Sequence, residues 1–424
     1  MRVGRMVQLD NLSAWFAFLL LKLASWTMHS LHVFVCLLAR TWWSCHFRVI
    51  WHTDERGHHM STSPIRIGIV GTGRISDLHV IEYLQNPLAE IVALCALDTS
   101  LATNRAIKWG LEDVAIEEDL DALLARQDVY MVEILLPHHL HLPAGLKAIA
   151  AGKIVSMQKP MCRSMTEANE LVTAVEATDR PFKVFENFIF YPPVSKAKQL
   201  IEDGAIGTPL SIRLKSNVGI SKTAWKVPES ANAWRQNPSQ SGGGPMVFDD
   251  GHHKFALAWH FMGNPEEVHA FIGSTQAADG SILDAQSIVS FRFPGNRIGN
   301  LEVVYSPELE IMTRHYPQDD RVEITGTKGV IWINCGHGRL GDPPPLSLYR
   351  DGNTTTFYDL ATGWEESFVL STRHYLDVLT NGGVPVLTAA EARQILRFAL
   401  AAEDSARTGM PVAVTGLGED FESN

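Results

Sequence analysis

The sequence predicts an α/β protein of two domains: a doubly wound parallel sheet at residues 60–185 and an α+β open-faced sandwich of mainly antiparallel strands at residues 186–424. Strands alternate with helices from residue 63 onward, and a glycine-rich turn follows the first strand. In the second half, short runs alternate apolar and polar residues between turn signals. The chain has 424 residues, 46% of them hydrophobic, which is enough to bury two cores.

Residues 1–59 differ from the rest of the chain. They hold five of the eleven tryptophans and six Lys or Arg against three acids. The run AWFAFLLLKLASWTMHSLHVFVCLLAR resembles a membrane helix, but Lys22, His29 and His32 interrupt the apolar stretch of about 20 residues that spanning requires. A start codon assigned too early, with Met60 as the working start, is the first interpretation; a membrane or targeting extension and an ordered appendage are the alternatives.

Composition narrows the classes of function. The net charge of −11 argues against a general affinity for nucleic acid or anionic membrane, because both need a basic face. A small-molecule partner is therefore expected. The five cysteines form neither CxxC pairs nor zinc-knuckle spacings, which fits a reducing, cytoplasmic compartment.

The first strand, turn and helix lie in SPIRIGIVGTGRISDLHVIEYLQNP, residues 63–87. A β-branched run precedes GTGRIS, and apolar residues at near-helical spacing follow it. The first glycine permits a tight turn, the second lets the backbone approach a pyrophosphate, and the helix N-terminus offers free N–H groups, as in a Rossmann domain. Taken alone, the glycines could merely turn the chain. The candidate cofactor-binding residues here are Gly71, Gly73, Arg74 and Ile75.

The second strand, EIVALCALD, ends in Asp98, 27 residues after Gly71. A carboxylate there can accept hydrogen bonds from the adenosine ribose and repels the extra phosphate of NADP, so NAD is expected rather than NADP. The alternative is a solvated residue at a strand end. A third unit, DVYMVEILLPHHLHLPAGLKAIAAGK, predicts another buried strand and helix.

The segment PHHLHLPAGLKAIAAGKIVSMQKPM, residues 137–161, carries a family resemblance. It is similar to the block TPxxxHxxxAxxALxAGKHVxxEKP of the glucose–fructose oxidoreductase, inositol dehydrogenase and rhizopine-catabolism family, written Gfo/Idh/MocA, which can be followed over residues 63–413. Gln158 stands where the family has the glutamate of EKP. The resemblance implies cofactor-side contacts for Pro137, His141 and Lys159.

The stretch SGGGPMVFDDGHHK falls where this family has GGGxLxDxGxHxxD. Asp249, Gly251 and His253 fit that spacing with one extra residue after the glycines, and Ala256 replaces the second aspartate. In the family, the lysine of EKP and the aspartate–histidine pair act on the hydroxyl or carbonyl that is oxidised or reduced. The resemblance therefore implies Lys159, Asp249 and His253 as catalytic residues.

Residue chemistry agrees with these roles. An aspartate and a histidine four residues apart at a helix start share one face. An imidazole that titrates near neutrality is a candidate general base, and Lys159 can stabilise an alkoxide or pass the proton itself. A shift of one residue would instead use Asp250 and Lys254, and His252 is a candidate substrate residue. A metal site is a third option, but no other His, Cys or Asp group shows ligand spacing, so no metal is expected.

The second domain is predicted from four alternating runs: EEVHAFIG, QSIVSFRFPGNRIGNLEVVYS, RVEITGTKGVIWIN and LSLYRDGNTTTFYDL. Helices at ALAWHFMG and AAEARQILRFALAAEDSARTG would cover one face of their sheet, and by analogy the other face would build a homodimer or homotetramer. The loop at residues 217–241 carries Trp225, Trp234 and Arg235, which could stack on a sugar ring or bind a hydroxyl; the alternative is that its tryptophans anchor the loop.

The expected function is hydride transfer between NAD and a hydroxyl or carbonyl of a sugar, cyclitol or related polyol, a substrate class that comes from the resemblance. The glycines after Gln240 would let the chain pass close to the nicotinamide, and the cluster after them would supply the proton-transfer groups. The alternatives are a dihydrodiol or carbonyl reductase, a glycoside hydrolase that retains NAD, and a catalytically silent regulator.

Replacing Asp98 by Ala is expected to weaken NAD binding much more than NADP binding, because NAD loses a ribose acceptor whereas NADP also loses a repulsive charge. Fluorescence titration with each dinucleotide measures the two affinities. Equal weakening of both would exclude the ribose role.

Overall fold

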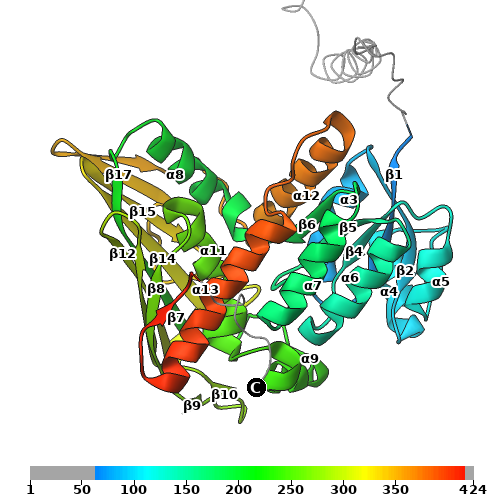
Figure 1. The fold of residues 1–424 in the computed structure, drawn as a ribbon, viewed down its shortest axis with the longest axis horizontal. Coiled ribbons are helices and arrows are strands. Elements are labelled where there is room, and N and C mark those ends of the chain that lie inside the picture. Colours follow the sequence, from blue (N-terminus) through cyan, green and yellow to red (C-terminus); the bar gives the residue numbers. More distant parts are fainter. Residues whose placement is uncertain (1–62, 416–424) are drawn as a thin grey trace, which may run out of the picture. The chain divides into compact units, whose positions relative to one another are not determined.

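Residues 63–415 are the part of the chain that the computed structural model describes, and Figure 1 shows their fold. The predicted extension at residues 1–59 and the start at Met60 lie outside the described residues. Within residues 63–415, no helix combines the length and the apolar character that crossing a membrane requires.

The first sheet has six strands in the order β3-β2-β1-β4-β5-β6, and every neighbouring pair is parallel. Parallel strands need crossover connections, which helices supply on both faces, so the predicted doubly wound sheet is confirmed. β4 is buried along its whole length, as a strand covered on both faces should be. The strands are β1 (Ile65–Val70), β2 (Ala89–Cys95), β3 (Ala115–Glu117), β4 (Met131–Ile134), β5 (Ile154–Gln158) and β6 (Phe182–Phe185).

Helices connect these strands where the sequence predicts helices after the glycine turn and after Pro137. The segment between β2 and β4 also forms α4, β3 and α5, which the sequence reasoning did not place. The helices are α3 (Ser76–Gln85), α4 (Thr99–Trp109), α5 (Leu120–Ala125), the short 3₁₀ helix η1 (His138–Leu140), α6 (His141–Ala150) and α7 (Met165–Glu176).

The second sheet has nine strands in the order β18-β17-β15-β14-β7-β12-β11-β8-β19. All neighbouring pairs are antiparallel except β7 and β12, which run parallel because a long connection separates them in the chain. The strands are β7 (Pro209–Ile220), β8 (Glu267–Ile272), β11 (Ser287–Phe293), β12 (Arg297–Glu310), β14 (Gln318–Gly326), β15 (Gly329–Cys335), β17 (Leu346–Arg350), β18 (Asn353–Phe357) and β19 (Val412–Ala413); two short pairs, β9 (Thr275–Gln276) with β10 (Ile282–Leu283) and β13 (Met312–Thr313) with β16 (Gly338–Arg339), stand apart from it.

One face of this sheet is covered, as predicted. Burial alternates strictly along β11, so one face is apolar and packed while the other is exposed. Phe398 of α13 lies with its ring centroid 4.9 Å from Phe291 of β11 and 4.7 Å from Phe255 of α11. The remaining helices are η2 (Phe188–Phe190), α8 (Pro192–Glu202), α9 (Glu229–Arg235), α10 (Pro238–Ser241), the π-helical turn η3 (Pro245–Asp250), α11 (Gly251–Met262), α12 (Trp364–Asn381) and α13 (Ala389–Thr408).

Helix α12 returns from the second half of the chain to pack beside α3 of the first domain (Figure 1). Its Leu376 is fully buried in one apolar cluster with residues of β1, β2 and β4. The Tyr375 hydroxyl donates to the carbonyl of Val155 at 2.9 Å, and Arg373 pairs with Glu82 at 2.8 Å. The first domain therefore depends on a helix encoded far from its strands.

Leu376→Ala is expected to destabilise the whole protein by about 2–5 kcal/mol, because it leaves a cavity at a fully buried site. Urea unfolding, followed by tryptophan fluorescence, measures the loss. An exposed leucine, Leu97→Ala, serves as the control, and a loss below about 1 kcal/mol at Leu376 would show that α12 contributes little to that core.

Candidate active site

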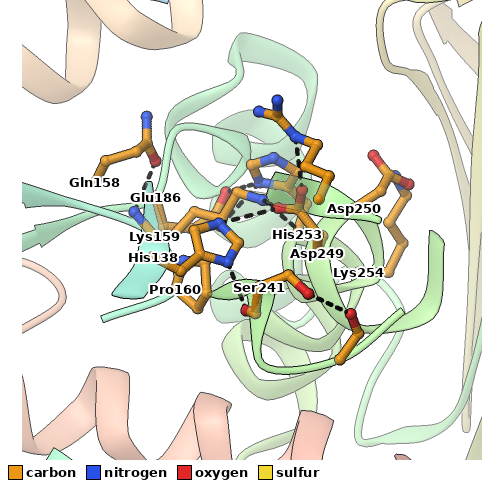
Figure 2. Close-up of polar contacts among 12 residues, drawn as sticks. His138, Gln158, Lys159, Pro160, Glu186, Ser241, Asp249, Asp250, His253 and Lys254 are labelled. Carbon is orange, nitrogen blue, oxygen red and sulfur yellow. Dashed lines mark hydrogen bonds and ion pairs between the residues drawn. The ribbon is translucent and has the colours of Figure 1, made fainter. Parts of the chain in front are cut away.

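The candidate site lies where the end of β5 meets the turn η3 (Figure 2). The Lys159 ammonium donates to the Asp249 carboxylate at 2.8 Å and to the Asp249 backbone carbonyl at 2.6 Å. Both side chains are only 10% exposed. The lysine of the first domain and the aspartate of the second therefore form one buried ion pair, with two of the three ammonium protons donated to Asp249.

Asp249 is held by further basic groups. Arg235 donates from Nε to its second carboxylate oxygen at 3.1 Å, and Nε2 of His138 lies 3.5 Å from the first. Burial would raise the pKa of Asp249, but Lys159, His138 and Arg235 together hold that pKa well below its usual value. Asp249 therefore stays ionised at neutral pH, so it orients Lys159 rather than accepting a proton.

His253 is paired with a glutamate that the sequence reasoning missed. Nδ1 of His253 lies 2.7 Å and 2.9 Å from the two carboxylate oxygens of Glu186 (Figure 2). The N–H of Phe188 also donates to Oε1 of Glu186 at 2.9 Å, so that oxygen is an acceptor and Nδ1 carries the imidazole proton. Nε2 then keeps its lone pair, and it hydrogen-bonds no group of the described chain.

Burial and nearby positive charges keep the imidazole of His253 neutral. Burial, and then the positive charges of Lys159 and Lys254, hold the pKa of His253 well below its usual 6.5. Burial raises the pKa of Glu186. The ring of Phe188 stacks on the imidazole with centroids 4.4 Å apart, which fixes its plane. A signal for Glu186 existed in the sequence: it is one acid in the apolar run VFENFIF directly after a buried strand.

His138 is a second residue that the reasoning passed over, although it opens the family-like block. Its Nδ1 lies 2.7 Å from the carbonyl of Ser241, which can only accept, so Nδ1 is protonated and Nε2 faces Asp249. Trp234 meets the ring of His138 edge-on with centroids 4.6 Å apart. The candidate substrate residues Trp234 and Arg235 therefore reach the site.

The alternative pairing of Asp250 with Lys254 forms a separate cluster. Lys254 donates to Asp250 at 2.7 Å and lies 3.3 Å from Asp320, while Lys159 binds Asp249. His252 is fully buried, neither ring nitrogen has a hydrogen-bond partner in the described chain, and burial lowers its pKa to about 3. Its role as a substrate residue stays a prediction.

The glycine turn fits a dinucleotide. Gly71 has φ +96°, and a Cβ there would lie 2.5 Å from the carbonyl oxygen of Leu135, so only glycine fits. A Cβ on Gly73 would meet no atom within 4 Å, so the backbone there faces open space. The N–H groups of Gly73, Arg74 and Ile75 donate to nothing in the described chain. Three free N–H groups before α3 suit a pyrophosphate.

Other predicted cofactor residues make contacts within the protein. Asp98 is exposed and caps α4: one of its carboxylate oxygens accepts from the N–H of Leu101 at 3.0 Å. The other oxygen is left for a ribose, a role that stays a prediction. His141 is fully buried, with Nδ1 2.8 Å from the carbonyl of Pro160 and Nε2 2.8 Å from that of Leu136. It therefore links the segment after β4 to the segment after β5, and Pro137 is the N-cap residue of η1.

Arg74 points away from its own turn and into the second domain. It donates to the carbonyl of Lys226 at 2.9 Å and to the hydroxyl of Tyr316 at 2.8 Å. Its guanidinium also lies 4.3 Å from the ring centroid of Trp225, whose other contacts include Trp364. Trp225 thus packs within the protein, and its role as a substrate residue or as an anchor of its loop stays a prediction. Within the described residues, no three His, Cys, Asp or Glu side chains come together as metal ligands.

Two family models match this chain. The model described as "Oxidoreductase family, NAD-binding Rossmann fold" matches residues 65–186, and "Oxidoreductase family, C-terminal alpha/beta domain" matches residues 198–414. The chain belongs to the Gfo/Idh/MocA oxidoreductase family. The fold class and the family resemblance are therefore confirmed, and the glycine turn belongs to an NAD-binding domain.

Named relatives of this Gfo/Idh/MocA chain act on sugars and cyclitols. It is 27% identical to levoglucosan dehydrogenase of Pseudarthrobacter phenanthrenivorans, over 50% of this chain and 54% of that enzyme, about half its length. It is 24% identical to scyllo-inositol 2-dehydrogenase (NAD+) of Bacillus subtilis, over 82% of this chain and 96% of that enzyme. The structure of levoglucosan dehydrogenase with NADH and levoglucosan shares the fold, with a TM-score of 0.70 at 22% identity over 83% of this chain and 100% of that chain.

The buried neutral histidines predict acid sensitivity. Burial lowers the pKa of His252 from 6.5 to about 3, and that of His260 to about 4. Below pH 6.5 the unfolded chain binds protons that the folded chain does not, so stability is fully present above pH 6.5 and falls with pH below it. Each histidine is expected to contribute about 1.4 kcal/mol per pH unit in that window. Urea unfolding at a series of pH values from 7 to 5 measures this slope together with the opposite slope from Glu403, whose pKa burial raises to about 7, and a stability that rises toward pH 5 would contradict the prediction.

Proposed function

We propose that this chain transfers a hydride between NAD and a secondary hydroxyl or carbonyl of a sugar, cyclitol or related polyol. The observation that supports this proposal most is that two pairs of interacting side chains lie at one site. One is the Lys159–Asp249 ion pair, and the other is the neutral His253 with its free Nε2, oriented by Glu186.

The division of labour follows from these contacts. NAD, when bound, would accept the hydride, and the N–H groups of Gly73, Arg74 and Ile75 would hold its pyrophosphate. The third N–H of Lys159 is left to donate to the substrate oxygen, where it would stabilise the alkoxide that forms. His253 accepts the hydroxyl proton at Nε2, and Glu186 stabilises the imidazolium that results. Asp249 fixes Lys159 throughout.

The substrate class rests on the relatives and on the wall of the site. Levoglucosan and scyllo-inositol, named for two relatives, are polyhydroxylated rings. Here Trp234 meets His138 edge-on, and Arg235 lies over the Trp234 ring while it donates to Asp249, so an indole and a guanidinium are close to the reacting groups. A neutral ring with several hydroxyls suits such a wall.

We further propose the division at residues 60–185 and 186–424, a cytoplasmic location, and a homodimer or homotetramer built on the open sheet face. Side chains exposed on that face include the apolar Ile288, Ile298 and Trp332, which a second copy would cover. Cys95 and Cys162 are free and buried, in keeping with a reducing compartment. Sedimentation velocity gives the subunit number directly.

Absorbance at 340 nm is expected to rise when the protein, NAD and the right member of a panel of sugars, cyclitols and sugar acids are mixed. Lys159→Ala is expected to lower kcat by about a thousandfold, because it removes the group on the developing alkoxide, while the NAD affinity stays within a few-fold. Lys147→Ala, an exposed lysine, is the matched control. Cleavage of aryl glycosides without net NADH would move the assignment to a hydrolase that retains NAD.

A further inference from the structure

A buried chain of hydrogen bonds ends on the backbone of Lys159. The Tyr83 hydroxyl donates to Glu133 at 2.7 Å, and the other oxygen of Glu133 lies 2.8 Å from Nδ1 of His79. Nε2 of His79 lies 2.7 Å from Nε2 of Gln158. Oε1 of Gln158 accepts from the Lys159 N–H at 2.7 Å (Figure 2). Glu133 and His79 are fully buried. We call these five residues the Glu133 network.

Burial would raise the pKa of Glu133, but His79 and Tyr83 hold that pKa below its usual value, so Glu133 is ionised. With this carboxylate, only one placement of protons satisfies every contact in the network. Oε1 of Gln158 accepts from Lys159, so the other end of that amide is an NH₂ group and donates to His79. Nε2 of His79 must then carry a lone pair, so Nδ1 carries the proton and donates to Glu133. The network therefore contains a neutral His79 and an ionised Glu133.

Gln158 occupies the position at which the family block has glutamate, and this exchange changes the charge that His79 meets. A glutamate at position 158 would accept from both Lys159 and Nε2 of His79, so the imidazole proton would sit on the opposite nitrogen. Here the carboxylate lies on the far side of the same ring, at Glu133 of β4. Both arrangements, a carboxylate at position 158 or one at position 133, place a single negative charge on one side of His79.

We propose that Glu133, His79 and Gln158 are positioning residues for Lys159, and that Glu133 supplies the single carboxylate that the network requires. This inference rests on the proposed function, since it assigns the residues to the reaction through Lys159. The network fixes the main chain of Lys159, and Asp249 fixes its ammonium. Together they define the position of the positive charge of Lys159.

The other groups packed around His79 do not set its protonation state, which Glu133 and Gln158 determine. Phe185 of β6 and Phe368 of α12 lie against the ring, with centroids 4.1 Å and 5.2 Å away. Lys183 of β6 acts on Glu133 by its charge, but its ammonium donates to Ser371, and burial lowers its pKa to about 7. Tyr83 lies on α3, as His79 does. Burial and Glu133 raise the pKa of its hydroxyl, so the hydroxyl keeps its proton and remains a donor.

Charge exchange between positions 133 and 158 tests the proposal. In Gln158→Glu, His79 stands between two carboxylates, and the network takes up one extra proton. When this extra proton leaves as pH rises, Lys159 is expected to shift. We therefore expect the kcat of Gln158→Glu, divided by the kcat of the unchanged protein, to fall about tenfold to a hundredfold over the pH range in which the proton is lost. Substrate KM and NAD affinity should change less than kcat.

The double variant Glu133→Gln with Gln158→Glu restores one carboxylate in a mirror-image network. The amide introduced at position 133 would accept from Tyr83 and donate to Nδ1 of His79, while the carboxylate introduced at position 158 would accept from Nε2. We expect kcat to recover about fivefold or more over Gln158→Glu alone, and the added pH dependence to disappear. If the losses of the two single variants multiply in the double variant, the positions are independent and the proposal is overturned.

Two further measurements separate this proposal from a merely structural effect and from the proposed function. Gln127→Glu makes the same chemical change at an exposed site and should leave kcat within about twofold. In ¹⁵N-histidine-labelled protein, His79 should show the Nδ1–H tautomer, and the double variant the Nε2–H tautomer. The opposite tautomer in the unchanged protein would refute the network. The expected tautomers without NAD reduction on any substrate would leave the network standing and remove the proposed function.

Discussion

The ion pair between Lys159 and Asp249 is the constraint on which the site depends. Burying an unpaired charge is costly, so Lys159, whose ammonium pairs with Asp249, could not remain nine-tenths buried without it. Lys159 follows β5 of the parallel sheet, and Asp249 lies in the turn before α11 of the second domain. The two domains must therefore meet at this point for the charges to be satisfied, and the same meeting assembles the reactive groups.

The site separates two ionisable pairs with different tasks. Asp249 is surrounded by cations and keeps its charge, whereas His253 is buried between cations and Glu186 and stays neutral. Environments that drive pKa values apart are how a protein assigns distinct acid and base roles at one pH. The sequence motif places aspartate and histidine on adjacent turns, and the charged groups around each buried side chain decide what it does.

The sequence allowed much of this to be predicted, because the informative residues lie within short segments. The glycine turn, Lys159, Asp249 and His253 each belong to a local pattern whose spacing has a geometric meaning. Glu186 and Glu133 do not, since they meet their histidines only after the chain has folded back over 67 and 54 residues.

The same limit explains the residues whose contacts differ from expectation. Arg74 finds its acceptor 152 residues away in the second domain, so its place in the turn says little about where its guanidinium lies. Asp98 also caps α4, a competing role that becomes visible only when the helix start is known. The parallel pairing of β7 with β12 follows from topology, which alternating polarity cannot report.

Helix α12 bears on how such proteins can be recombined. Residues of this helix fill the core beneath β1, β2 and β4, although some 180 residues separate it from the end of β6. A fragment that stops near residue 186 would lack part of its own interior, and a chimaera that joins this nucleotide-binding half to another enzyme's second half would inherit a foreign helix against its strands. The structural unit around β1, β2 and β4 is therefore discontinuous in sequence, and an exchange of halves between relatives keeps its packing intact when residues 364–381 travel with the N-terminal part.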